Sequence, residues 1–297
     1  MQKTAYSSRF SGFRHRERIR VNFRLKDRDR EIIRAVNDCR VLKTQQIQAL
    51  FFGSPKPAYG RLKKLHDNGY LERHYIAEVA TAPASSTILY SITKLGAEVL
   101  AATYEYTSED FHFASKNLLN PAKLPHLLAV NDLRVALTRA SHAEGFRLTE
   151  WLDEFSFRAN PDYVNIKESG SKQRRKPVYP DGYVILKTPL GEARCFIEVD
   201  RGTEGLTQFR SQIEIYQEYM LSGRYQERFQ TRSLRVLIVT TSSQRRLDSL
   251  KKAVAQAGGG ERYWFLLLKQ PLPGQILTKP LWQKIDSQEL HTLIPLA

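Results

Sequence analysis

The stretch that decides the fold of this chain is PDGYVILKTPLGEARCFIEVD, residues 180–200. Two apolar segments, 178–186 and 194–200, flank the connection KTPLGEA and predict a β-hairpin. Carboxylates lie near the outer ends of both strands, Asp181 on the first and Glu198 and Asp200 on the second. Because the chain has a net charge of +15, this acidic group marks the hairpin as a candidate functional site.

The turn decides whether the three carboxylates share a face. Glu198 and Asp200 are two residues apart on a strand and therefore face the same way. A two-residue turn that ends at Gly191 places Asp181 opposite Asp200. Pro189 and Gly191 instead favour a type I turn with a bulge, which turns Asp181 to the other face unless a second bulge restores it. We expect a shared face.

Carboxylates on one face need a neutralising partner. Cross-strand neighbours lie about 5 Å apart, and like charges at that distance are costly without a proton or a cation. Mg²⁺, with Mn²⁺ as a substitute, prefers oxygen ligands and would polarise a phosphate and supply hydroxide. Asp181, Glu198 and Asp200 are therefore the predicted metal ligands.

The second half of the chain alternates helices and strands around the hairpin. The apolar patterns predict helices at 126–143, 203–221 and 242–257 and further strands at 146–151, 234–240 and 263–268. A hairpin followed by a crossover helix and another strand predicts a mixed sheet with helices on both faces. The predicted fold class is α/β in this half and α+β for the chain overall. The segment KESGSKQRRKP at 167–177 is interpreted as a basic loop that could guide a phosphate backbone, or as a solvated surface loop.

This order of elements resembles the PD-(D/E)xK nuclease superfamily, whose fold is that of restriction endonucleases. Pro180-Asp181 matches the first part of the motif, and Glu198-Val199-Asp200 occupies the second. The resemblance implies a metal-dependent endonuclease or nickase with Asp181, Glu198 and Asp200 as catalytic residues. Asp200 stands where the family usually has lysine. Arg201 and Lys187 are candidate substitutes, and enzymatic activity stays an open question.

Helix 203–221 carries a Q-x-x-x-Y pattern that resembles the RecB-like members of that superfamily. The resemblance places Gln212 near the metal and DNA, as a fourth catalytic residue. Tyr216 lies on the apolar stripe, so core packing is its expected role. His126 is interpreted as a packed residue at a helix start rather than a ligand. Glu154 is either an auxiliary acid or, as we expect, a surface partner of Arg158.

The first half predicts three helices and two strands. The third helix begins at Ser54-Pro55 and ends at Asn68-Gly69. Strands at 70–77 and 87–92 then flank a wing-like loop, and a helix follows Thr93. This segment, 27–102, resembles the winged helix-turn-helix superfamily, although some of its members dock proteins instead. In the DNA-binding members the third helix enters the major groove, which here implies DNA contacts from its outward residues Lys56, Tyr59, Arg61, Lys63 and Lys64.

Charge and composition support a polyanionic partner. The chain has 46 Lys and Arg against 31 Asp and Glu, which favours double-stranded DNA, although a merely soluble basic protein is the alternative. Residues 1–26 are predicted to form a basic disordered arm that lies along phosphates, with Arg14, Arg16 and Arg18 among its contacts.

The predicted domains are a winged helix at 27–104, a linker at 105–121 and a nuclease-like domain at 122–297. The two cysteines, Cys39 and Cys195, cannot form a disulfide framework, so a reducing cytosol is expected. No apolar segment is long enough to span a bilayer. A cytoplasmic location on the nucleoid or a plasmid follows from this interpretation.

Three segments extend the resemblance to most of the chain, namely HLLAVNDLRVAL at 126–137, YPDGYVIL at 179–186 and FIEVDRGTE at 196–204. Together with the winged helix they resemble the replication-relaxation family of plasmids and mobile elements. That family implies an accessory role in plasmid replication or DNA relaxation. Three hypotheses remain: a DNA-processing enzyme, a DNA-binding regulator with an inactive nuclease-like domain, and an adaptor that recruits a relaxase, replication initiator or transposase. The oligomeric state is open, with a dimer as one candidate.

Overall fold

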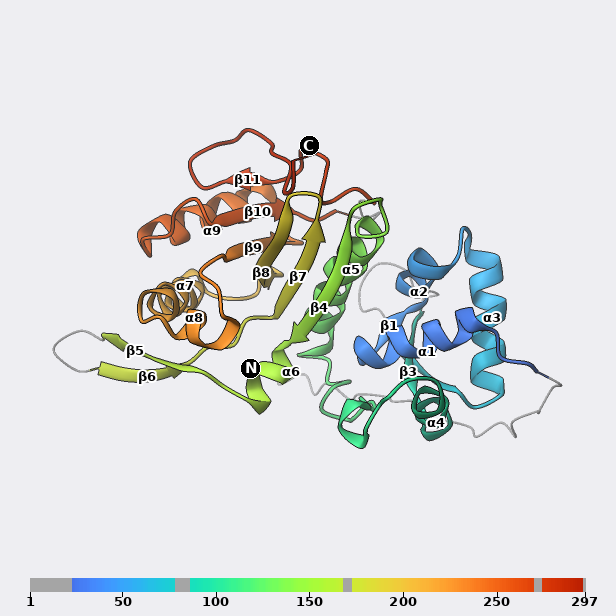
Figure 1. Cartoon of the computed structure of the whole chain (residues 1–297). Helices are drawn as coiled ribbons and strands as arrows, with labels where there is room; N and C mark the ends of the chain where they lie inside the picture. The colour runs from blue at the N-terminus through green and yellow to red at the C-terminus, as the bar shows by residue number, and fades with distance from the viewer. Residues whose placement is uncertain (1–22, 78–85, 168–172, 270–273, 296–297) are drawn as a thin grey trace, which may run out of the picture. The chain divides into compact units, whose positions relative to one another are not determined.

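The computed structural model describes residues 23–77, 86–167, 173–269 and 274–295 (Figure 1). The chain forms two compact units, 1–114 and 115–297, with the boundary inside the segment expected to be a linker. Three expectations lie outside the described residues: the arm with Arg14, Arg16 and Arg18, the tip of the wing-like loop, and residues 168–172.

The first unit combines helices with a small antiparallel sheet of order β1-β3-β2. Its elements are α1 Asp27–Asp38, β1 Leu42–Lys43, α2 Thr44–Phe51, α3 Pro55–Asp67, β2 Leu71–Ala77, β3 Ser86–Ile92, α4 Lys94–Thr103 and the 3-10 turn Ser108–Asp110.

The helices of the first unit form where apolar spacing and end signals coincide. The inward stripe of α3, Ala58, Leu62 and Leu65, is fully buried, as the i, i+4, i+7 spacing predicts. The helix starts with proline and ends before Gly69, whose φ of +81° suits a residue without a Cβ. The Thr93 hydroxyl accepts a hydrogen bond from the Gly96 N–H and caps α4.

The segment after α4 packs against α1 and the end of β3, within the first unit. The Asn37 side chain on α1 donates to the Asp110 carbonyl at 2.8 Å and accepts from the His112 N–H at 2.8 Å. Phe113 forms an isolated bridge with Ile92 at the end of β3. The first half of the predicted linker is therefore part of this unit, because a buried asparagine satisfies its hydrogen bonds there.

The second unit contains a six-stranded sheet of order β11-β10-β9-β8-β7-β4. Its elements are α5 Leu124–Ala140, β4 Arg147–Asp153, α6 Glu154–Ala159, β5 Tyr163–Lys167, β6 Gln173–Pro177, β7 Gly182–Thr188, β8 Gly191–Asp200, α7 Leu206–Leu221, α8 Arg224–Phe229, β9 Arg235–Thr240, α9 Gln244–Gln256, β10 Tyr263–Leu267 and β11 Gln283–Lys284. Pairs β8–β9 and β9–β10 are parallel and the others antiparallel. The predicted mixed sheet is confirmed.

Alternation along β8 separates two cores. Cys195, Ile197 and Val199 pack on the side of α5, where Leu133 and Leu137 are fully buried. Phe196 faces the opposite core, which α7 and α9 cover. Because side chains alternate along a strand, Glu198 and Asp200 also belong to the α7 and α9 side.

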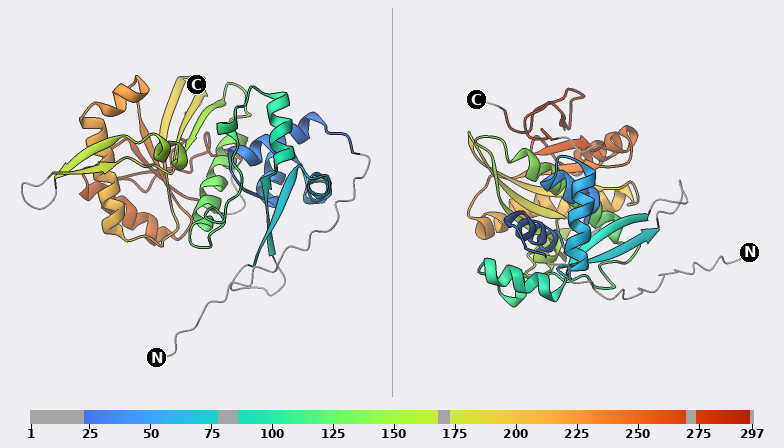
Figure 2. Two further views of the ribbon diagram at one scale, coloured as in Figure 1. Left: turned by 90° about the horizontal axis from the view of Figure 1, so that it is seen from below. Right: turned by 90° about the vertical axis from the view of Figure 1, so that its right-hand side faces the viewer.

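The basic segment 167–177 was expected to be a loop, and the structure corrects this. Residues Gln173–Pro177 form β6, which pairs with β5 in a separate two-stranded ribbon that projects from the main sheet (Figures 1 and 2). The Arg175 guanidinium covers the Tyr163 ring at 3.9 Å. Strand β6 was not predicted from the sequence, because an exposed, basic strand lacks the apolar alternation that is typical of a half-buried strand.

Candidate functional site

The β7–β8 hairpin turns at Pro189-Leu190, one residue earlier than the two-residue turn ending at Gly191 that was considered from the sequence, and without the Gly191 bulge of the alternative. Thr188 pairs with Gly191, and at the other end Gly182 pairs with Ile197. Continuing this register sets Asp181 level with Glu198 instead of Asp200. Asp181 itself lies just outside the paired strands, and its charge is close enough to contribute to the raised pKa of Glu198.

Asp181 lies just before β7, where the ladder is irregular. Its N–H donates to the Ile197 carbonyl at 3.1 Å, although the register places Gly182 there. Local irregularities of this kind re-aim side chains. The carboxylate accepts from the Val199 N–H at 2.7 Å and contacts His126 Nε2 on α5 at 2.8 Å. Asp181 is thus fixed at the end of the sheet, between α5 and β8.

Glu198 lies on β8 with its carboxylate directed to α7. The Tyr216 hydroxyl donates to Glu198, and Gln212 Nε2 donates to the Tyr216 oxygen at 2.8 Å and to the Tyr179 carbonyl at 3.3 Å. Burial, followed by the charge of Asp181, raises the pKa of Glu198 well above its usual value. The Q-x-x-x-Y pattern therefore forms a hydrogen-bond chain that ends at this carboxylate.

Tyr216 combines two roles that sequence reasoning had separated. It is 1% exposed and belongs to the core, as expected, yet its hydroxyl also bonds Glu198. A buried tyrosine requires a partner for its hydroxyl, and the glutamine four residues earlier was the available signal. The assignment of Tyr216 to core packing alone is corrected.

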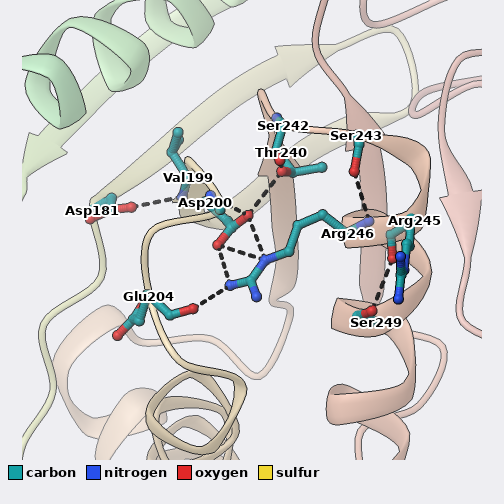
Figure 3. Close-up of polar contacts among 11 residues, drawn as sticks. Asp181, Val199, Asp200, Glu204, Thr240, Ser242, Ser243, Arg245, Arg246 and Ser249 are labelled. Atoms are coloured by element: carbon teal, nitrogen blue, oxygen red, sulfur yellow. Dashed lines mark hydrogen bonds and ion pairs between the residues drawn. The ribbon is translucent and has the colours of Figure 1, made fainter.

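Asp200 forms a salt bridge with Arg246 (Figure 3). Arg246 Nη2, on α9, donates to Asp200 Oδ1 at 2.6 Å, and Nε lies 3.1 Å from Oδ2. The Thr240 hydroxyl and the Gly202 N–H also donate to Asp200, at 2.9 and 3.0 Å. The carboxylate is therefore already neutralised and saturated with hydrogen bonds.

The expected three-carboxylate metal site does not form. Within the residues that the structure describes, no three His, Cys, Asp or Glu side chains are arranged to hold a metal ion. The reason is Arg246, which occupies the oxygens of Asp200 that a cation would need. Arg246 lies 46 residues from Asp200 in the chain, and no local pattern around the hairpin indicated it.

Two further residues surround the Asp181–Glu198 pair. Burial disfavours the charged imidazole of His126, but the hydrogen bond and charge of Asp181 outweigh it and raise its pKa. Burial and the charges of Asp181 and Asp200 raise the pKa of Glu204. His126 is thus a hydrogen-bond partner of the acidic pair, beyond the packing role expected for it.

Glu154 forms an ion pair with Arg158 one helical turn away, and the interpretation of a surface pair is confirmed.

The donor groups that remain suit a cation such as Mg²⁺. Mg²⁺ is commonly held by one or two carboxylates and keeps several of its waters. Asp181 and Glu198 supply two carboxylates whose mutual repulsion already raises the pKa of Glu198. Asp200 is excluded by its salt bridge. Asp181 and Glu198, which no arginine or lysine neutralises among the described residues, are therefore the two carboxylates left as candidate metal ligands.

The outward face of α3 retains some of the predicted DNA contacts. Lys56 and Lys64 are exposed, and Tyr59 is 49% exposed. Lys63 is exposed but forms an ion pair with Asp67 one turn later. These side chains leave a positive surface on α3.

Arg61 does not belong to that surface. Its Nε donates to Asp29 Oδ1 on α1 at 2.6 Å, and Nη2 contacts the other carboxylate oxygen. The Asp29 side chain is fully buried, and the guanidinium also covers the Phe23 ring at 4.4 Å. The assignment of Arg61 to DNA is corrected: it holds α3 against α1.

The structure is that of an α/β protein whose second unit contains a mixed sheet. A family model, described as replication-relaxation, matches residues 33–233. The chain therefore belongs to the replication-relaxation family, and this membership supports a role in replication of a plasmid or another mobile element. The resemblance drawn from the sequence is confirmed.

Further comparisons add little to the family match. Among solved structures, the chain is similar to that of restriction endonuclease FokI, with 11% sequence identity and a TM-score of 0.26 over 82% of this chain. The match spans 42% of the FokI chain, less than half its length. No curated protein matches the chain. Among the described residues, no helix has the length and apolar character needed to cross a membrane.

Proposed function

We propose that the protein binds double-stranded DNA through a winged helix in its first unit and cleaves one strand with a nuclease-like second unit. The observation that supports cleavage is that Asp181 and Glu198 lie near the ends of neighbouring strands, where the charge of Asp181 adds to burial in raising the pKa of Glu198. The Gln212–Tyr216 hydrogen-bond chain supports the same assignment, because it ends at the carboxylate of Glu198 and orients it. Family membership gives the context, which is replication of a mobile element.

The residues around the pair hold each carboxylate in place. The Val199 N–H and His126 fix the two oxygens of Asp181 separately. Tyr216 orients Glu198 and is itself held by Gln212. Asp181 and Glu198 would hold Mg²⁺ or Mn²⁺, which when bound would supply Lewis-acid polarisation of a phosphate and a hydroxide at neutral pH. The preorganised side chains reduce the reorganisation that binding requires.

The decisive experiment is incubation of supercoiled plasmid with the full chain and Mg²⁺ or Mn²⁺, followed by electrophoresis. Conversion to the open circular form in the presence of metal, and none in chelator, is the expected result. Absence of conversion with either metal, by protein that still binds the plasmid, would contradict the cleavage proposal.

A second candidate function is DNA binding without cleavage. The observation that favours it is Asp200, which stands where the resembled nuclease motif carries lysine and is occupied by Arg246. The second unit would then hold DNA or recruit a relaxase, replication initiator or transposase. Capture of such an enzyme by purified protein in the absence of DNA would favour this candidate over nicking.

Metal binding can be tested without reference to activity. Adding Mn²⁺ is expected to raise the thermal midpoint of the wild-type chain, because a ligand at 100 times its Kd stabilises the folded state by about 2.7 kcal/mol. Asp181→Asn removes a carboxylate charge and should abolish this rise. Glu192→Gln, an exposed acid on the same hairpin, should retain it. An equal rise in all three proteins would place the metal elsewhere.

The DNA-binding proposal for α3 predicts a change in salt dependence. Lys64→Gln should weaken binding to many sequences alike and reduce the slope of log Kobs against log salt by about one unit, since one phosphate contact is lost. Lys94→Gln, an exposed lysine of the same unit at the start of α4, is the matched control. Fluorescence anisotropy on labelled duplexes measures both. An unchanged slope for Lys64→Gln would exclude this contact.

A further inference from the structure

Arg73 is a buried cation, and two of its three guanidinium nitrogens have no acceptor in the part of the chain that the structure describes. It lies on β2 opposite Tyr90 of β3 and is 7% exposed. Its Nε and Nη2 are both buried and donate no hydrogen bond to the described residues. Arg61 and Arg246, by contrast, are each matched to a buried aspartate.

The surroundings of Arg73 balance its charge only in part. The Tyr90 and Tyr59 rings lie 5.6 and 5.8 Å from the guanidinium carbon. Such rings attract a cation but leave its N–H donors unsatisfied. The Tyr90 side chain is fully buried, and its hydroxyl lies beside Arg73 and Thr44. Burial raises the pKa of Tyr90, while Arg73 and Thr44 beside it act in the opposite direction.

The two unpaired, buried nitrogens of the Arg73 guanidinium indicate a missing acceptor. Native proteins leave few buried polar groups unpaired, and each such group calls for an explanation. A guanidinium with free N–H groups and a neighbouring hydroxyl match the oxygens of a phosphate, which arginine binds with two parallel hydrogen bonds. The first turn of α2, which begins at Thr44, adds a partial positive charge of the same sign.

We propose that Arg73 and Tyr90 form a phosphate-binding site, and that its ligand is a backbone phosphate of DNA. The exposed Tyr59 connects this site to the α3 surface with Lys56 and Lys64. The inference rests on the proposed DNA binding by the first unit, because a free phosphate or nucleotide carries the same chemistry. The phosphate contact would come from β2, in addition to the contacts predicted for α3 from the sequence.

The test compares Arg73→Met, Tyr90→Phe and the control Lys94→Met in the full chain. Arg73→Met should leave the thermal midpoint unchanged or raised, because it removes an unpaired buried charge. Its affinity for duplex DNA should fall about tenfold, and the slope of log Kobs against log salt should fall by about one unit. Tyr90→Phe should weaken binding less and leave the slope unchanged. Lys94→Met should match the wild type.

The outcomes separate this site from the proposed function. Equal affinity and slope for wild type and Arg73→Met on DNA would overturn the site and leave DNA binding intact. A lowered midpoint with unchanged DNA affinity would show a purely structural arginine.

If the wild type does not bind duplex DNA, the proposed function fails, and pyrophosphate then decides the phosphate site. A midpoint raised by pyrophosphate in the wild type but not in Arg73→Met would support a site for free phosphate compounds. No rise would exclude the site.

Discussion

Replacing Arg61 with alanine is expected to lower the free energy of unfolding of the first unit by about 3–5 kcal/mol. The change leaves the Asp29 carboxylate, whose side chain is fully buried, without its cation. Of the hydrogen bonds to the Asp29 carboxylate, the one from the Lys26 N–H, at 2.7 Å, remains. The cost arises because a charge without a partner stays out of water.

Hydrogen exchange of the amides of α1 and α3 in urea is the suitable measurement, because the two units need not unfold together. Lys64→Ala, an exposed lysine on the same helix, is the control and should change stability little. The double variant Asp29→Asn, Arg61→Met should lose less than the sum of its single changes. Equal stability of Arg61→Ala and Lys64→Ala would contradict the structural role of Arg61.

Replacing Glu198 with glutamine is expected to reduce metal-dependent nicking by more than about 100-fold. Changes to residues that only orient a metal ligand typically cost 10- to 100-fold in activity or metal affinity, and loss of a ligand charge should exceed that. Tyr216→Phe removes the hydroxyl that bonds Glu198 and should fall within the 10- to 100-fold range. The rate of open-circle formation from supercoiled plasmid measures both.

Glu214→Gln is the matched control, since Glu214 lies on α7 as well and pairs with Arg210 at 3.1 Å. It should nick at the wild-type rate. Nicking by Glu198→Gln at that same rate would remove Glu198 from the reaction. A normal rate for Tyr216→Phe together with an inactive Glu198→Gln would retain the carboxylate and reject the hydrogen-bond chain.

Apolar spacing was enough to predict the elements that build both cores. The inward stripe of α3 and the alternation along β8 follow directly from residue periodicity, because burial of those side chains drives both structures. The Q-x-x-x-Y pattern also marked the two residues of α7, Gln212 and Tyr216, that form a hydrogen-bond chain to Glu198, while the predicted place of Gln212 near a metal and DNA stays a prediction. Local sequence thus determined where the elements lie and which acids the hairpin carries.

Polar partners distant in sequence could not be predicted in the same way. Arg61 flanks the buried stripe of α3, three residues after Ala58, so helical spacing alone permits either an outward or an inward position. Its partner Asp29 is 32 residues earlier. Asp200 likewise meets Arg246 only after β9 and α9 fold back on β8. Charge pairing of this kind depends on tertiary structure, which periodicity does not encode.

The Asp200–Arg246 salt bridge makes the two positions dependent on each other. A lysine at 200 would complete the ordinary nuclease triplet in the linear sequence, yet it would face the Arg246 guanidinium across a buried space. Replacing Asp200 alone with lysine would therefore bring two positive charges together. Relatives that carry lysine at this strand position should carry a neutral or acidic residue at the start of the helix, and the two sites should covary.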